Sequence, residues 1–398
     1  MITLKKLLCQ SKHFSLFLAT LVLALTGTNA KAQCPTSVFA TGLKAPTKII
    51  STPAGNLLVA EAGMGQNTGR ISIIDPSGNR RTLLDGLPSG LAPPNNAPIG
   101  PSGLALRGRT LYITIGAGDE VLAGPLPATE VPNPNPSSPL FSSVLAIRFN
   151  SSVEETTDGF ALTLADHVNL NTGLPLNLTN AAGDRLTVEL VTDFPDFTYE
   201  FRPGVPNNVR PSNPFGLVVN GRKLYVVDAA QNAIREVEIN TGDSRILLTF
   251  PRRANTLPFG PPVIDPVPDS IRLFGKHLLV TFLTGFPFPP GQADVRRVNR
   301  TNNSHSQLIG GLTSAIDVLP VKNSSNQDQF IVLEFSTSMT AQPPAPGRLR
   351  LFDLSGQATV IADCLISPTS VALNTTDGFL YATEIFTGRI IRIPSPVM

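Results

Sequence analysis

A phrase of three short apolar runs, each bounded by a turn, recurs along this chain of 398 residues. Its clearest copy covers residues 214–240, where Asn220-Gly221 separates the first two runs. Asn-Gly tolerates the positive φ of a tight hairpin, so the two runs are expected to be antiparallel neighbours. Copies of the phrase begin near Pro46, Pro101, Pro214, Pro268, Ser314 and Pro368. Successive starts lie roughly 50 residues apart, except that the interval after Pro101 is about twice as long.

A fourth, outer strand follows the third run in several copies, for example at residues 81–84 and 244–248. Units of about 45 to 55 residues with four short strands are typical of propeller blades. The last copy stops after its third strand, near Ile393, and its missing outer strand matches residues 37–43. The sequence therefore predicts an all-β, six-bladed β-propeller closed by an N-terminal strand that completes the last blade. Closing the ring in this way removes exposed strand edges.

The long interval contains residues 151–198, which lack the repeated phrase. Residues 158–164 could form the outer strand of blade 2, whereas the polar, Asn-rich remainder has no blade-like start. We expect an insertion at about 151–198, in or after blade 2, rather than a seventh blade. The predicted division of the chain is a signal peptide at 1–32 and a propeller at 33–398.

The signal peptide is predicted from the order of charge and apolarity at the N-terminus. Lys5, Lys6 and Lys12 precede or border an apolar core at residues 14–25, and Ala30 and Ala32 provide the small residues of a cleavage site. The apolar core is too short to span a membrane comfortably, and no later segment approaches the required length. We therefore expect a secreted or periplasmic protein with no transmembrane segment after cleavage.

Two cysteines, Cys34 and Cys364, would remain in the mature protein. An oxidising compartment permits a disulfide between them. The repeat register, however, places Cys34 at the start of one outer strand and Cys364 at the end of the equivalent strand. A strand of about seven residues separates those levels by roughly 20 Å, whereas bridged Cα atoms lie within about 7 Å. The register therefore argues against a bridge that the compartment would allow.

Charge and histidine content exclude several classes of function. Lys and Arg number 31 against 29 Asp and Glu, so no nucleic-acid partner is indicated. The chain has four His, no Cys/His metal spacing and no G-x-S-x-G motif. A histidine-based hydrolase or quinoprotein is therefore poorly supported. We expect a monomer.

The long, Pro-rich connections all fall on one face of the predicted propeller. Connections from the second to the third strand, and from the outer strand to the next blade, emerge together; examples are residues 117–140, 284–292 and 336–346. Loops carry function on rigid scaffolds, so we expect this face to bind a small molecule or a protein partner, although solvated decoration is an alternative. Among these loops, residues 284–290 place Phe286 and Phe288 among prolines, either as a lid over a ligand or as a cap on a neighbouring loop.

Acidic residues end the second strand in four copies of the phrase: Glu61, Asp228, Glu334 and Glu384. Equivalent positions circle the axis, so several of these carboxylates could converge at the channel mouth. Ca²⁺ takes carboxylate and amide oxygens as ligands, which makes Glu61, Asn213, Asp228 and Glu384 candidate metal ligands. The alternative is that each acid satisfies turn amides or pairs with an arginine of a third strand, such as Arg70, Arg348 or Arg389.

Several phrases resemble those of a known family. Ala-Thr-Gly-Leu at 40–43, Ala-Glu-Ala-Gly at 60–63, Ile-Gly-Ala-Gly at 115–118 and Asn-Pro-Phe-Gly at 213–216 resemble the ScyD/ScyE family of exported, NHL-like six-bladed propellers. That family is associated with biosynthesis of the pigment scytonemin in cyanobacteria, and members also occur where the pigment does not. The resemblance covers residues 38–393 and implies an exported propeller with an accessory or binding role. The chain departs from the acidic pattern in blade 4, where Phe282 ends the second strand.

Two functions follow as hypotheses, and whether the chain is an enzyme stays open between them. The first is an exported binding protein or accessory factor, with its predicted ligand-binding residues at Glu61, Asn213, Asp228, Phe286, Phe288 and Glu384. The second is a divalent-cation-dependent hydrolase of the gluconolactonase-like kind. In that hydrolase a divalent cation such as Ca²⁺ would polarise a carbonyl group and activate water. Metal content together with the effect of removing the carboxylates separates the two hypotheses.

Overall fold

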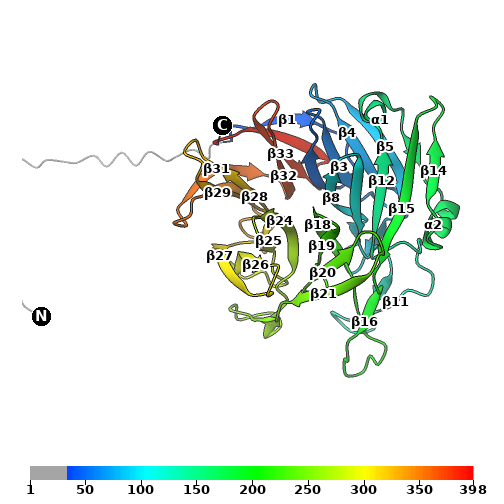
Figure 1. The fold of residues 1–398 in the computed structure, drawn as a ribbon. Coiled ribbons are helices and arrows are strands. Elements are labelled where there is room, and N and C mark those ends of the chain that lie inside the picture. Colours follow the sequence, from blue (N-terminus) through cyan, green and yellow to red (C-terminus); the bar gives the residue numbers. More distant parts are fainter. Residues whose placement is uncertain (1–33, 398) are drawn as a thin grey trace, which may run out of the picture. The chain divides into compact units, whose positions relative to one another are not determined.

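Six small β-sheets form the blades of a β-propeller in a computed structural model of the chain (Figure 1). The structure describes residues 34–397. The prediction of an all-β, six-bladed propeller is confirmed. The predicted signal peptide, residues 1–32, lies outside the described residues. None of the described helices is both long and apolar enough to cross a membrane.

Blades 3, 4 and 5 each consist of four consecutive antiparallel strands, numbered from the inner strand outward. Blade 3 comprises β18 (Pro214–Asn220), β19 (Lys223–Asp228), β20 (Ala233–Glu238) and β21 (Ser244–Thr249). Blade 4 comprises β24 (Pro268–Phe274), β25 (His277–Phe282), β26 (Ala293–Asn299) and β27 (His305–Leu312). Blade 5 comprises β28 (Ala315–Lys322), β29 (Asp328–Glu334), β30 (Gly347–Phe352) and β31 (Ala358–Leu365).

Blade 6 combines the two ends of the described chain. Its inner strands are β32 (Pro368–Asn374), β33 (Phe379–Glu384) and β34 (Arg389–Pro394). The outer position is taken by β1 (Ser37–Ala40), which pairs antiparallel with β34 so that Val38 lies opposite Ile391. The first and last strands of the fold are therefore hydrogen-bonded neighbours.

The insertion contributes to blades 1 and 2, and part of it differs from the prediction. Blade 1 contains β2 (Pro46–Ser51), β3 (Leu57–Glu61), β4 (Gly69–Ile74) and β5 (Arg80–Leu87), and blade 2 contains β8 (Pro101–Arg107), β9 (Thr110–Ile115) and β12 (Ser143–Phe149). The outer strand of blade 2 is β15 (Arg185–Asp193), with β14 (Leu176–Thr179) at its edge. Residues 158–164, expected in that position, instead provide β13 (Phe160–Ala161), which pairs in parallel with β5 of blade 1.

Two short helices explain this rerouting of the insertion. Asn150 caps α1 (Ser151–Thr156), and Thr163 forms a capping box with Asp166 at the start of α2 (Leu164–Asn171). Val153 of α1 and Leu170 of α2 are fully buried in one core cluster with the side chains of blades 1 and 2. The chain therefore covers the edge of blade 1 before it returns to complete blade 2.

Cys34 and Cys364 form a disulfide, with 5.9 Å between their Cα atoms. The expectation that strand register keeps them apart is wrong. It assumed that residues before β1 continue the outer strand of blade 6, but residues 34–36 are not in the strand. They bring Cys34 next to Cys364 in β31, the outer strand of blade 5.

The second strand of each blade is the centre of its core. All five residues of β3, for example, are buried. A strand in this position is covered on both faces by neighbouring blades, which explains its unbroken apolar sequence. Burying one large aliphatic side chain of this kind contributes about 1.5–3 kcal/mol.

Candidate functional site

The acids that end the second strands share one arrangement, here called the loop-base pairs. In blade 1, Glu61 is fully buried, pairs with Arg70 of β4 at 2.7 Å, and accepts the backbone N–H of Lys44. In each case the guanidinium comes from the third strand and the amide from the linker that leads into the same blade. The other pairs are Asp228 with Arg235, Glu334 with Arg348 and Arg350, and Glu384 with Arg389. Their amides come from Asn213, Thr313 and Ile366.

This arrangement explains why the acid recurs in the blades, and the explanation requires no bound ligand. A buried carboxylate is stable only where counter-charge and hydrogen bonds replace water. Each loop-base pair meets that need inside its own blade and fixes where the linker enters the inner strand. Among residues 34–397, no group of three or more His, Cys, Asp or Glu side chains is placed to hold a metal ion.

The predicted metal ligands are therefore brought together only in part. Asn213 and Asp228 are neighbours, because the Asn213 N–H donates to Asp228 at 2.9 Å. The Asn213 side-chain oxygen accepts from Ala117 N instead, at 3.2 Å, and joins blades 2 and 3. Glu61 and Glu384 belong to separate loop-base pairs in blades 1 and 6. The predicted Ca²⁺ site would require these arginine pairs to open.

Blade 4 shows what replaces the acid where it is missing. Phe282 occupies the equivalent position, and the guanidinium groups of Arg253 and Arg296 lie 5.1 and 5.6 Å from its ring centre. Both arginines pair with Asp294 on the third strand. In blade 4 the acid of the ion pair therefore lies on the third strand, and an aromatic ring occupies the end of the second strand, where the other blades have the acid.

The loop-rich face carries four small hairpins that the repeats do not share. They are β6 (Gly90–Ala92) with β7 (Ala97–Ile99), β10 (Val121–Ala123) with β11 (Glu130–Pro132), β16 (Phe197–Tyr199) with β17 (Val209–Pro211), and β22 (Arg253–Ala254) with β23 (Val263–Ile264). All four lie within the connections predicted to emerge on this face.

Among the described residues, every exposed Phe and Tyr side chain lies on a loop of the loop-rich face, either in one of these hairpins or in a connection from a second to a third strand. Phe201 is 84% exposed and Tyr199 72%, both at the β16–β17 hairpin, and Phe286 is 57% and Phe259 49% exposed on the next two loops. We call these four residues the aromatic rim. A fifth exposed ring, Phe386, lies in the equivalent loop of blade 6.

A network of ion pairs underlies the aromatic rim. Asp265 accepts from Arg210 at 2.8 Å and from Arg252 at 3.0 Å, and Arg252 also reaches Glu200 beside Phe201. Although burial alone would raise the pKa of Asp265, Arg210 and Arg252 hold it below its ordinary value. The Gly285 N–H donates to the Asp265 carbonyl, which joins the Phe286 loop to the same network.

The predicted lid residues have two different surroundings. Phe286 is exposed, whereas Phe288 is half-buried, and their rings meet edge to face at 6.2 Å. Pro287 between them lies so close to Gly260 that a Cβ there would stand 3.0 Å from its ring. The loop is thus a cap on its neighbour that still leaves one ring free.

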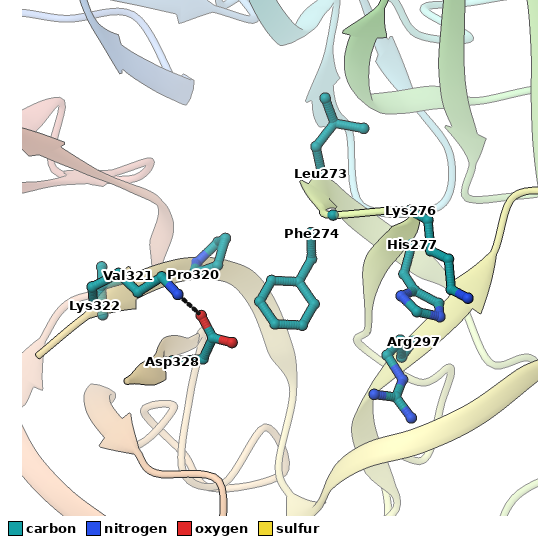
Figure 2. Close-up of a pocket in the computed structure, with 10 residues that line it drawn as sticks. Leu273, Phe274, Lys276, His277, Arg297, Pro320, Val321, Lys322 and Asp328 are labelled. Atoms are coloured by element: carbon teal, nitrogen blue, oxygen red, sulfur yellow. Dashed lines mark ion pairs between the residues drawn. The ribbon is translucent and has the colours of Figure 1, made fainter. Parts of the chain in front are cut away.

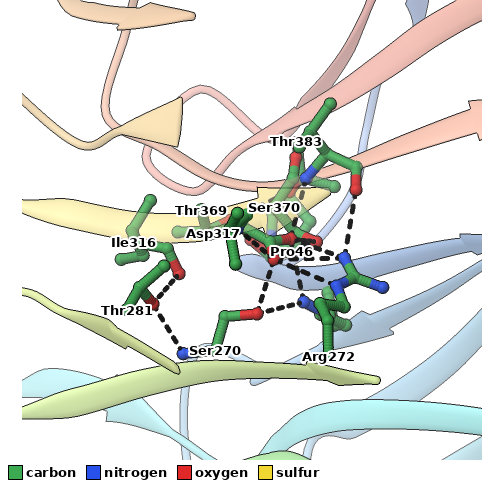
Figure 3. Close-up of polar contacts among 12 residues, drawn as sticks. Pro46, Ser270, Arg272, Thr281, Ile316, Asp317, Thr369, Ser370 and Thr383 are labelled. Carbon is green, nitrogen blue, oxygen red and sulfur yellow. Dashed lines mark hydrogen bonds and ion pairs between the residues drawn. The ribbon is translucent and has the colours of Figure 1, made fainter. Parts of the chain in front are cut away.

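The propeller axis holds a second polar centre, which we call the axial cluster: Lys48, Ser270, Arg272, Asp317 and Ser370. Figure 3 shows Asp317 enclosed by side chains from the inner strands of other blades. Its carboxylate accepts from Lys48 of blade 1 at 2.8 Å, from Arg272 of blade 4 at 2.8 Å and from Ser370 of blade 6 at 2.8 Å. One fully buried carboxylate of blade 5 thereby connects four blades.

The charged side chains of the axial cluster shift one another's pKa values. Although burial would raise it, Arg272 and Lys48 hold the pKa of Asp317 far below its ordinary value. Burial and the charge of Arg272 lower the pKa of Lys48 to about 8. Nearby Asp269 is 4% exposed, has one carboxyl oxygen without a partner, and has its pKa raised well above the ordinary value by burial. Asp317 is therefore ionised at pH 7, whereas burial favours the protonated form of Asp269.

A buried acid also lies under the β10–β11 hairpin. Glu120 is 3% exposed, accepts from the Ser142 hydroxyl at 2.8 Å, and keeps one oxygen without a partner. Burial and the charge of Asp196 raise the pKa of Glu120 to about 10. Among the residues that the structure describes, no arginine pairs with this carboxyl, in contrast to the loop-base pairs.

Sequence reasoning missed the axial cluster and Glu120. A usable signal for the axis was present: Lys48, Asp269, Arg272 and Asp317 are charged residues inside inner-strand runs that are otherwise apolar or small. Charges in buried positions are usually paired with one another. Glu120 lies in a loop that shows no periodicity, so nothing in its sequence context indicated burial.

Comparison with known proteins supports the fold alone. No protein-family model and no curated protein matches the chain. An auxiliary nutrient binding protein from Bacteroides thetaiotaomicron is similar in structure, with a TM-score of 0.51 and 9% identity over 88% of this chain and 69% of that chain. A gluconolactonase from Xanthomonas campestris has a TM-score of 0.48 and 10% identity over 90% of this chain and 88% of that chain. At such identities the likeness shows the β-propeller architecture and no shared activity.

Proposed function

We propose that this chain is an exported β-propeller binding protein that contacts a protein partner through the aromatic rim of its loop-rich face. The observation that carries the proposal is the confinement of exposed rings to that face among residues 34–397. Tyr, Trp and Phe are enriched at protein interfaces, where their large apolar area is buried at a small cost in conformational entropy.

The support beneath the rim favours binding over simple solvation. Three loops that carry the rim are joined through Asp265 and its arginines, so the rings stand on a connected base. A connected base lowers the entropy lost when a surface binds its partner. Proline-stiffened loops without function would not need exposed rings, which are costly in water.

Export is part of the proposal and has its own support. The Cys34–Cys364 disulfide suits an oxidising compartment, where such bridges form and persist. The predicted signal peptide and the resemblance to the ScyD/ScyE family point to the same location. N-terminal sequencing of the mature protein from the exported fraction tests this, with Gln33 as the expected first residue. A mature chain that retains residues 1–32 would contradict it.

The cation-dependent hydrolase has less support from the geometry. Its proposed ligands Glu61, Asp228 and Glu384 each have an arginine counter-charge within 2.8 Å. A metal at this position would have to displace those guanidinium groups. Elemental analysis of the mature protein tests the hydrolase directly, and a stoichiometric divalent cation would favour it.

Partner capture with matched variants tests the binding role. Mature protein is incubated with the exported protein fraction of its own source, and captured proteins are compared for wild type, a rim double variant (Phe201→Ser, Phe286→Ser) and a control double variant (Ile246→Ser, Val360→Ser). The control residues have similar exposure but lie on outer strands. We expect a purified partner to bind the rim variant at least about tenfold more weakly and the control unchanged. Equal binding to all three proteins would overturn the proposal.

A further inference from the structure

A groove between blades 4 and 5 opens on the face opposite the loop-rich face, at the turns that join first and second strands. It has a volume of about 570 Å³, within the range of small-molecule sites. Figure 2 shows Lys276, His277 and Arg297 on one side of Phe274, and the Lys322–Asp328 pair on the other. The groove therefore has one cationic side and one neutralised side.

The cations on that side have no carboxylate partner among the described residues. Neither Lys276 nor Arg297 forms an ion pair there, whereas the only acid lining the groove, Asp328, already pairs with Lys322 at 2.7 Å. A second groove, in blade 2, is lined by Arg109 and Arg148, which both pair with glutamates, and by Arg185, which has no ion pair among the described residues. Within residues 34–397, the groove between blades 4 and 5 thus differs in having two cations without an ion pair, Lys276 and Arg297, where the blade 2 groove has one.

The turn that carries two of these groups is held in place. Arg300 donates to the carbonyls of Gly275 at 2.8 Å and Lys276 at 3.1 Å. Burial, then the charges of Arg297, Lys276 and Arg300, lower the pKa of His277. Its imidazole is therefore neutral at pH 7 and offers an N–H donor beside the two cations.

Apolar side chains line the middle of the groove: Leu273, Phe274, Pro320 and Val321. Phe274 is anchored by edge-to-face packing on Phe330 at 5.3 Å. A small inorganic anion would leave this apolar surface exposed to water, whereas a ligand with a flat hydrocarbon body would cover it. A planar guanidinium such as that of Arg297 matches the two oxygens of a carboxylate.

We propose that this groove binds a small aromatic carboxylate, with the ring system against Phe274 and Pro320 and the carboxylate at Arg297 and Lys276. The site is separate from the aromatic rim, so binding at one does not require binding at the other. It adds a small-molecule site to a protein proposed to bind a protein partner elsewhere.

Calorimetric titration of the mature protein with three probes tests the chemistry of the groove. The probes are 2-naphthoate, its neutral analogue 2-naphthamide, and acetate, which lacks the apolar body. We expect 2-naphthoate to bind at least about tenfold more tightly than either of the others, because only it uses both the charge and the apolar floor. No saturable binding of 2-naphthoate, or equal affinity for the naphthoate and the amide, would overturn the proposal.

Two exposed substitutions locate the binding. Arg297→Gln and Lys276→Gln are each expected to weaken 2-naphthoate binding, Arg297→Gln by about tenfold, and to leave 2-naphthamide binding unchanged. Arg185→Gln, an exposed arginine that lines the blade 2 groove, is the matched control and is expected to have no effect. Unchanged thermal unfolding of all three variants shows that the fold is retained. Equal losses at Arg297 and Arg185 would place the binding elsewhere.

Discussion

The loop-base pairs and the axial cluster are both buried ion pairs, but they join different parts of the protein. Each loop-base pair connects a second strand, a third strand and a linker within one blade, as Glu384, Arg389 and the Ile366 N–H do in blade 6. The axial cluster occurs once and joins the inner strands of four blades through Asp317. The repeated charges therefore shape single blades, whereas the unrepeated charge holds blades to one another.

This difference shows that the residues repeated in a propeller sequence are those that stabilise each blade individually. Contacts between blades across the axis differ from blade to blade, so they leave no periodic trace. Loss of a contact across the axis should therefore lower the stability of the whole ring, whereas loss of a loop-base pair should destabilise only the structure near one loop.

The largest effect is expected for Asp317→Asn. The substitution leaves Lys48 and Arg272 buried without their counter-charge, which typically costs about 3–5 kcal/mol of unfolding free energy. Urea denaturation followed by circular dichroism measures the loss, with Asp243→Asn at an exposed turn as a control that should change stability by less than about 0.5 kcal/mol. A loss no greater than that of a loop-base substitution would remove the distinction between the two regions.

A smaller and local effect is expected for Glu384→Gln. Arg389 is partly exposed and can regain water, so we expect a loss of about 1–2 kcal/mol. Hydrogen exchange should rise at residues 366–367 and 385–388 and stay unchanged in blades 3 and 4. Faster exchange spread over all six blades would mean that this pair also acts on the whole ring.

Glu120 extends the comparison to a buried carboxyl that has no arginine. Its raised pKa means that the folded protein keeps a proton which the unfolded chain releases above about pH 4.5. The stability due to that proton is therefore present at low pH and is lost as pH rises toward the folded pKa near 10. Glu120→Gln cannot ionise, so its stability should be similar to that of wild type at pH 4 and higher by several kcal/mol at pH 8, since each pH unit above about 4.5 costs the wild type about 1.4 kcal/mol. Parallel stability curves from pH 4 to pH 8 would contradict this.

The smallest effect is expected from a chelator. Because arginines already neutralise the loop-base carboxylates, EDTA should change the midpoint of thermal unfolding by less than about 1 °C. Addition of Ca²⁺ to the chelated protein is the control and should be equally without effect. A fall of several degrees that Ca²⁺ restores would support the predicted metal site at Glu61, Asn213, Asp228 and Glu384.

The sequence predicted the fold because each blade repeats the same local solution. Apolar second strands and turn dipeptides such as Asn220-Gly221 are determined by the structure of a single blade, so they can be recognised in one sequence. The sequence favours residues 158–164 as the outer strand of blade 2, although β15 (Arg185–Asp193) forms it. That error arose because Phe160 is also apolar, and only the packing of α1 and α2 decides which segment reaches which blade.

The candidate site was predictable to a lesser degree. The loop-rich face and Phe286 were identified from loop lengths and composition, whereas Tyr199, Phe201 and Phe259 were not singled out. Exposure of a ring depends on what packs beside it, and the sequence does not show that. Contacts between distant segments, such as Lys48 with Asp317 or Cys34 with Cys364, depend on how the ring closes.

The disulfide between Cys34 and Cys364 has a consequence for the integrity of the molecule after damage. It turns 330 residues of sequence separation into one covalent circle that passes through all six blades. A protease that cuts an exposed loop within this circle, for example near residues 124–128, opens the circle without releasing a fragment. A nicked propeller would therefore stay in one covalently linked piece for as long as the disulfide is intact.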